Sequence, residues 1–90
     1  MKGSVFNGFE NYVEQSYGLH VWQRIIDNST LENNGVFLDS DAYNDQELIS
    51  IVTELSICVS KSVDDIQREF GEFFFTTLYS LARKHVEHID

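Results

Sequence analysis

The first 22 residues, MKGSVFNGFENYVEQSYGLHVW (Met1–Trp22), decide the fold. Apolar side chains recur at helical spacing from Val5 to Tyr17, with Glu10 and Glu14 on the opposite side, which predicts an amphipathic helix. Gly18 is the expected end of this helix, because glycine tolerates the left-handed backbone that such ends use. The chain therefore opens on a helix and continues directly into a second apolar pattern.

Three more helices follow from the same periodicity. The second is expected from Leu19 to about Ser29. The third begins near Asn44, whose side chain can accept a hydrogen bond from an exposed backbone N–H, and the fourth begins at Ser62. The polar tail from Ala82 to Asp90 is expected to fray.

The segment between the second and third helices loses the helical period. Asn33-Asn34-Gly35 is a turn signal. Val36-Phe37-Leu38 is a short apolar island, predicted to be one extended, strand-like segment tucked under the helices. Taken together, residues 1–90 are predicted to be a single all-α domain of about four helices around a Phe-rich core.

Composition excludes several classes of function. The net charge is −9, and the six basic residues form no stripe, which argues against nucleic acid and against an anionic membrane surface as partners. No apolar run approaches the length of a membrane span, and no signal-peptide pattern is present, so a cytoplasmic location is expected. Cys58, the only cysteine, lies among apolar residues and is expected to act as a small core side chain.

Five blocks of sequence resemble the N-terminal half of the heme nitric-oxide/oxygen-binding (H-NOX) domains, bacterial relatives of the sensor domain of soluble guanylate cyclase. Each block alone is weak, but their order and spacing together are specific. The blocks are Met1-Lys2-Gly3, Phe6-Asn7-x-Phe9, Gly18-Leu19-x-x-Trp22, Tyr43-x-Asp45-x-Glu47-Leu48 and Asp64-Asp65-x-x-Arg68-x-Phe70-Gly71-x-Phe73-x-Phe75.

The resemblance implies a distal lobe that lies over one face of a heme. Carried over by position, Val5 and Phe9 would be distal-pocket residues on the first helix, and Phe74 and Leu78 would be wall residues on the fourth. Because Phe74 cannot donate a hydrogen bond, the resemblance implies selectivity for nitric oxide over oxygen. It also implies a signalling partner, either a histidine kinase or a cyclic-di-GMP enzyme.

The family's metal ligand is not among these 90 residues. By resemblance, the proximal histidine, the Tyr-x-Ser-x-Arg motif that holds the heme propionates, and the later sheet all belong beyond Asp90. The resemblance therefore implies a partial sensor domain.

Other interpretations of the same residues remain open. The phenylalanines from Phe70 to Phe75 are read more simply as core, and three consecutive ones cannot share one helix face, so at least one should be exposed. His85-x-x-His88 offers too few ligands for a closed zinc site. No arrangement of nucleophile and base is recognisable, so an enzyme is not expected.

The alternative function is a heme-free helical module that self-associates or binds a partner through an exposed Phe-rich face.

Overall fold

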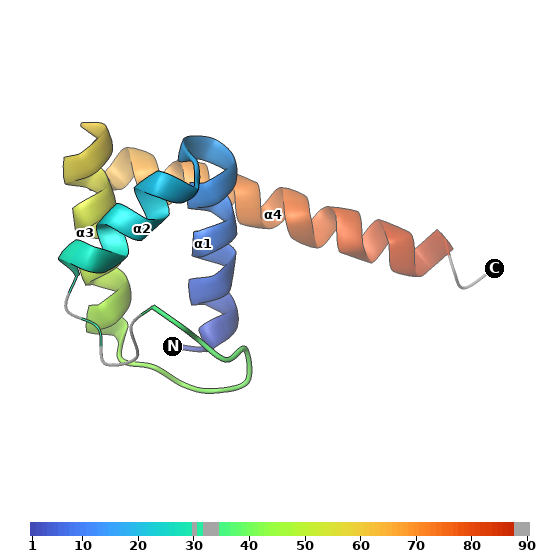
Figure 1. Cartoon of the computed structure of the whole chain (residues 1–90). Helices are drawn as coiled ribbons and strands as arrows, with labels where there is room; N and C mark the ends of the chain where they lie inside the picture. Colours follow the sequence, from blue (N-terminus) through green and yellow to red (C-terminus); the bar gives the residue numbers. More distant parts are fainter. Residues whose placement is uncertain (30, 32–34, 88–90) are drawn as a thin grey trace.

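The computed structural model describes residues 1–29, 31 and 35–87, and the side chains of these residues as far as residue 76. Within that part of the chain there are four helices and no strand, and one isolated bridge pairs Lys2 with Ala42. Figure 1 shows α1, α2 and α3 grouped together, while α4 crosses behind α1 and runs past the other helices. The helices are α1 (Gly3–Tyr17), α2 (Leu19–Asn28), α3 (Asp45–Val59) and α4 (Val63–Glu87). The prediction of an all-α fold with about four helices is confirmed.

Gly18 ends α1 and starts α2. Its φ of 100° lies in the region that favours glycine. Its N–H donates to the carbonyl oxygens of Val13 and Glu14, each at 3.1 Å, so two of the carbonyls left unpaired at the end of α1 are satisfied. Gly18 therefore ends α1, as the sequence predicted, and α2 packs against α1.

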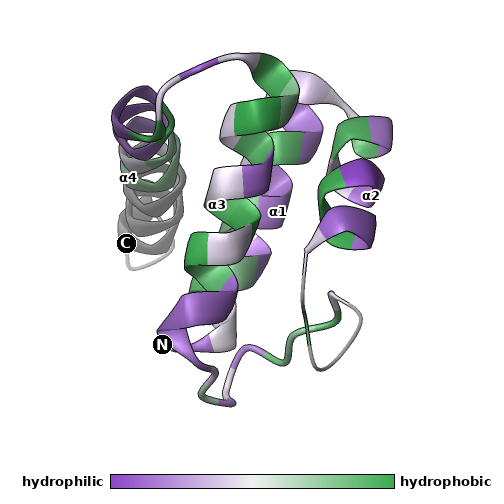
Figure 2. Ribbon diagram, turned by 90° about the vertical axis from the view of Figure 1, so that its left-hand side faces the viewer, coloured by the Kyte–Doolittle hydropathy of each residue, from purple (hydrophilic) through white to green (hydrophobic). Residues whose placement is uncertain are grey.

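The core consists of apolar side chains from all four helices and from the connection between α2 and α3. Figure 2 shows the hydrophobic side of α2 turned toward α1 and α3, with its hydrophilic side outward. Burying this surface is the main stabilising term of the fold, at about 25 cal/mol for each Å² of apolar area. The buried core residues are Phe6, Phe9, Tyr12, Val13, Trp22, Ile25, Phe37, Ile51, Leu55 and Ile66.

The connection between α2 and α3 differs from its prediction. Val36-Phe37-Leu38 forms no strand, and only Phe37 is buried; Val36 is 68% exposed and Leu38 is 60% exposed. Neighbouring side chains of an extended backbone point in opposite directions, so an island of three apolar residues can bury its middle member alone. The ring of Phe37 stacks on Phe6 at a centroid distance of 4.3 Å.

Side-chain caps begin α3 and α4. The Asn44 side-chain oxygen accepts from the Gln46 N–H at 2.9 Å, and the Ser62 hydroxyl accepts from the Asp65 N–H at 3.1 Å. Residues 82–87, which were expected to fray, are helical and belong to α4, and residues 88–90 of that tail lie outside the described residues. None of the helices in the described part of the chain has the length and apolar content needed to cross a bilayer.

Candidate functional site

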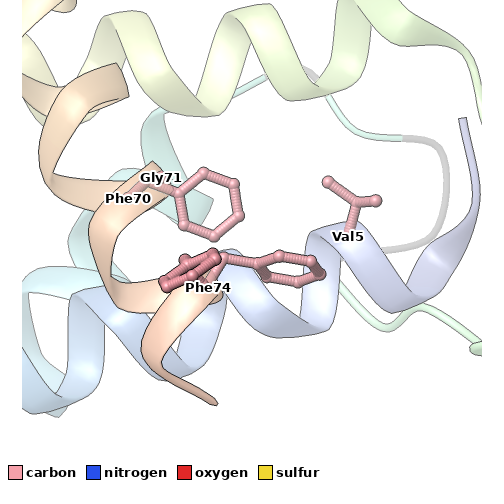
Figure 3. Close-up of a pocket in the computed structure, with 5 residues that line it drawn as sticks. Val5, Phe70, Gly71 and Phe74 are labelled. Atoms are coloured by element: carbon pink, nitrogen blue, oxygen red, sulfur yellow. The ribbon is translucent and has the colours of Figure 1, made fainter. Parts of the chain in front are cut away.

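An apolar pocket of about 270 Å³ lies open to solvent where the N-terminal half of α1 faces α4. Its lining is carbon-rich throughout: Val5 from α1, and Phe70, Gly71, Phe74 and Phe75 from α4. Figure 3 shows Val5 on one helix and Phe70, Gly71 and Phe74 on the other, around one shared space. None of these side chains can donate a hydrogen bond.

The four predicted site residues do not all lie in the pocket. Val5 and Phe74, which lie 69 positions apart in the sequence, line the same pocket. Phe9 is buried in the core beneath it, and its ring meets Phe70 edge-on at 5.1 Å. The side chain of Leu78 lies outside the described residues.

Three lining residues, Phe70, Gly71 and Phe75, and one neighbour were not predicted. Phe70 and Gly71 join Phe74 in the wall, and helical spacing of three and four residues from Phe74 was the available signal. Gly8 of α1 lies directly against the wall, because a Cβ there would come within 3.0 Å of the Phe74 ring. Phe75 is 70% exposed, which confirms that the three consecutive phenylalanines do not share one face.

The lining of the pocket is apolar and provides no ligand for a heme iron. The one histidine whose side chain is described, His20, is exposed on α2 and is not among the lining residues. None of the described basic side chains lines the pocket, so it offers no cation for heme propionates. Among the described residues no cluster of metal-ligating side chains is found, and His85 and His88 lie outside this set of side chains.

A hydrogen-bonded cluster joins α1 to α4 away from the pocket. One carboxylate oxygen of Glu69 accepts from the hydroxyls of Tyr12 at 2.7 Å and Tyr17 at 2.9 Å. The other accepts from the Lys61 ammonium at 2.5 Å, and that ammonium lies 5.5 Å from the centroid of the Tyr17 ring. The hydrogen bonds from Lys61, and then those from the two tyrosines, lower the pKa of Glu69 from 4.5 to about 2.

Glu10, a carboxylate on α1, has its pKa shifted in the opposite direction from that of Glu69. The sequence placed Glu10 and Glu14 on the solvent side, but both are half-buried. Desolvation raises the pKa of Glu10 from 4.5 to about 7, and the hydrogen bond and negative charge of Glu14 add to the rise. Ionised Glu10 therefore destabilises the folded state.

We expect Glu10→Gln to stabilise the protein at pH 8 and not at pH 4. A carboxyl whose folded pKa is raised contributes stability below its unfolded pKa of about 4.5, and this stability is lost as the pH rises through 7. The gain at pH 8 should be about 1 kcal/mol, well below the full value of the shift because Glu10 is partly in contact with solvent. Urea denaturation at both pH values measures it. Equal gains at the two pH values, or an equal gain from Glu72→Gln at an exposed position, would contradict this cause.

The fold closely matches solved structures of one family. The unliganded Fe(II) H-NOX protein from K. algicida superposes with a TM-score of 0.84 at 32% identity, covering 89% of this chain and 43% of that one. An H-NOX protein from S. oneidensis in the Fe(II)NO state superposes with a TM-score of 0.77 at 29% identity, covering 100% of this chain and 49% of that one.

Sequence comparison gives the same family. A Drosophila melanogaster relative, soluble guanylate cyclase 89Da, is 27% identical over 74 residues, which are 82% of this chain and 11% of that protein. The chain thus spans less than half the length of the solved relatives described above. The family model described as Haem-NO-binding matches residues 2–89. This chain belongs to the Haem-NO-binding, or H-NOX, family of heme-based gas-sensor domains, and it matches the helical N-terminal part of their fold.

Proposed function

We propose that this chain forms the distal part of a heme-based nitric oxide sensor domain that acts in signal transduction. The supporting observation is the apolar pocket in which Val5 of α1 and Phe74 of α4 come together. Heme iron supplies the coordination position for a diatomic gas. The chain supplies an apolar wall that excludes water from one face of the heme.

The wall also bears on which gas is bound. Val5, Phe70 and Phe74 contain no hydrogen-bond donor in their side chains. A hydrogen-bond donor would stabilise oxygen on a heme held here more than it would nitric oxide, and these side chains would supply none. The described lining residues therefore favour nitric oxide.

A hemin titration with and without added imidazole tests the proposal. Free imidazole would supply the axial ligand that the described side chains do not offer at the pocket, so a sharp Soret band that shifts on addition of nitric oxide, and that differs from the band of hemin and imidazole without protein, is expected. Gly71→Phe adds a ring at a lining position where a Cβ meets no atom within 4 Å, and it should weaken hemin binding by about tenfold, or ~1.4 kcal/mol.

Ile57→Phe is the matched control. Ile57 is 69% exposed on α3 and is not a lining residue, so the added bulk should leave hemin binding unchanged. Broad absorbance that neither imidazole nor nitric oxide sharpens would count decisively against a heme wall. Equal binding by Gly71→Phe and the unsubstituted chain would place the hemin elsewhere.

The proposed signalling partner is inferred from the family to which the chain belongs. H-NOX domains couple to cyclase or kinase effectors, and they sense rather than catalyse. For this chain we take the partner to be a histidine kinase or a cyclic-di-GMP enzyme.

A second candidate is a heme-free interaction module. Phe75 is 70% exposed at the edge of the apolar pocket, and a large apolar side chain there favours self-association. Sedimentation of the same samples separates the two functions. An oligomer that persists unchanged when hemin is added supports the module, and a monomer at high concentration excludes it.

A further inference from the structure

α4 crosses α1 with the Phe74 ring lying against Gly8. A Cβ on Gly8 would lie 3.0 Å and 3.2 Å from two ring carbons of Phe74, and 3.9 Å from the Phe70 ring. With no side chain at Gly8, the Phe74 ring packs directly on the α1 backbone. The rings of Phe9 and Tyr12 contact Phe70 on the C-terminal side of this contact.

The apolar pocket and the cluster around Glu69 lie on opposite sides of Gly8 along α1. N-terminal to Gly8, Val5 lies in the pocket with Phe70 and Phe74. C-terminal to it, Tyr12 donates to Glu69. Val5 and Tyr12 are about 10 Å apart along α1, so a change in the crossing angle that moves one moves the other in the opposite direction.

Glu69 is the acceptor that the hydroxyls of Tyr12 and Tyr17 and the Lys61 ammonium share. It accepts from Tyr12 and Tyr17 of α1 on one oxygen, and from Lys61 of the connection between α3 and α4 on the other. A carboxylate held by three donors from two separate segments has little freedom to move. Glu69 also precedes Phe70 in α4, so fixing Glu69 fixes the rotation of α4 that turns Phe70 and Phe74 toward α1.

We propose that Glu69 is the positioning residue of the pocket: by holding Tyr12, Tyr17 and Lys61 on one side of the Gly8 crossing, it sets how far Val5 stands from Phe74 on the other side. This assignment rests on the proposed function for its meaning, because the Val5–Phe74 separation determines the shape of the wall offered to a heme.

A purely structural role makes a different prediction. Tyr12 is 2% exposed, and its hydroxyl needs an acceptor whatever the pocket does. If Glu69 only satisfied that hydroxyl, its replacement would lower stability and leave the Val5–Phe74 geometry intact. The test must therefore measure the pocket itself as well as stability.

The experiment compares Glu69→Gln with Glu72→Gln, which removes the same charge from the next turn of α4 outside the cluster. In the apo protein, NMR cross-peaks between the Val5 methyl groups and the Phe74 ring report their separation. Glu69→Gln should shift both sets of signals and change the intensity of the cross-peaks, and Glu72→Gln should leave them as they are. Tyr17→Phe and Lys61→Met, which each remove one donor, should produce smaller shifts in the same direction.

Each outcome decides the proposal. If Glu69→Gln shifts only the signals of Tyr12 and Tyr17, Glu69 positions nothing beyond the cluster and the proposal is overturned. Should Glu69→Gln fail to fold, Tyr17→Phe and Lys61→Met decide in its place, and unchanged Val5 and Phe74 signals in both would overturn it. Because these measurements need no heme, a failed hemin titration would contradict the proposed function and leave the positioning result standing.

Discussion

Gly3→Ala is expected to lower the free energy of unfolding by about 3 kcal/mol, because the added methyl group overlaps backbone that has no room to move. A Cβ at Gly3 would lie 1.9 Å from the carbonyl oxygen of Leu38 and 2.9 Å from the ring of Tyr43. The segment that it meets is fastened in place, since the Gly3 N–H donates to the Asp41 carbonyl at 2.9 Å. Urea denaturation followed by circular dichroism measures the loss.

The matched control is the same substitution at Gly71. That glycine lies inside α4, and a Cβ there meets no atom within 4 Å. Alanine is the better helix former, so Gly71→Ala should raise the free energy of unfolding by about 0.5–1 kcal/mol. The two substitutions thus have opposite expected signs, and a Gly3→Ala variant as stable as the unsubstituted chain would contradict the close approach at Leu38.

Phe6→Ala is expected to cost about 4 kcal/mol, a large share of the 5–15 kcal/mol by which a small domain is usually stable. The Phe6 side chain is fully buried, stacks on Phe37 at 4.3 Å and meets Tyr43 edge-on at 5.6 Å. Removing its ring leaves a cavity and takes away the surface on which the connection between α2 and α3 packs.

Two measurements separate this effect from general destabilisation. Phe75→Ala removes the same ring from a 70% exposed position and should change stability by less than about 0.5 kcal/mol. In Phe6→Ala, the Tyr43 amide, which donates to the Met1 carbonyl at 2.7 Å, should lose protection from hydrogen exchange before the amides of α3. Equal loss of protection throughout the chain would show that Phe6 does not specifically hold the connection.

Helix positions were predictable because their signals are local. Gly18 and Asn44 mark helix ends through their own backbone and side-chain chemistry, and the structure places the ends there. Apolar side chains at helical spacing, such as Ile51, Leu55 and Ile66, are buried in the structure. The errors arose where a local pattern leaves burial undecided: in the island around Phe37, in which alternate side chains point outward, and at Glu10, which its period placed in solvent.

The candidate site was predictable only in part. The family resemblance named Val5 and Phe74, and the structure brings them to one pocket. The same resemblance could not show that Phe9 lies beneath the wall or that Phe70 and Gly71 belong to it, because those assignments depend on how α4 is rotated against α1. Nothing in the sequence indicated that Glu69 joins a hydrogen-bonded cluster, since a glutamate on a helix surface is most often solvated.

By itself, the sequence determined which segments are helical, which side of each is buried and to which family the chain belongs, since spacing, caps and motif order are properties of neighbouring residues. Tertiary structure alone decided which buried sides meet. No local pattern specifies which residues pair across the helices. Examples are the contacts of Gly3 with Leu38, of Gly8 with Phe74, and of Tyr12 with Glu69, which is 57 residues further along the chain. The hydrophobic effect rewards burial without choosing a partner. Steric fit and hydrogen bonding between whole helices make that choice, and here they place the pocket on one side of the Gly8 crossing and the cluster around Glu69 on the other.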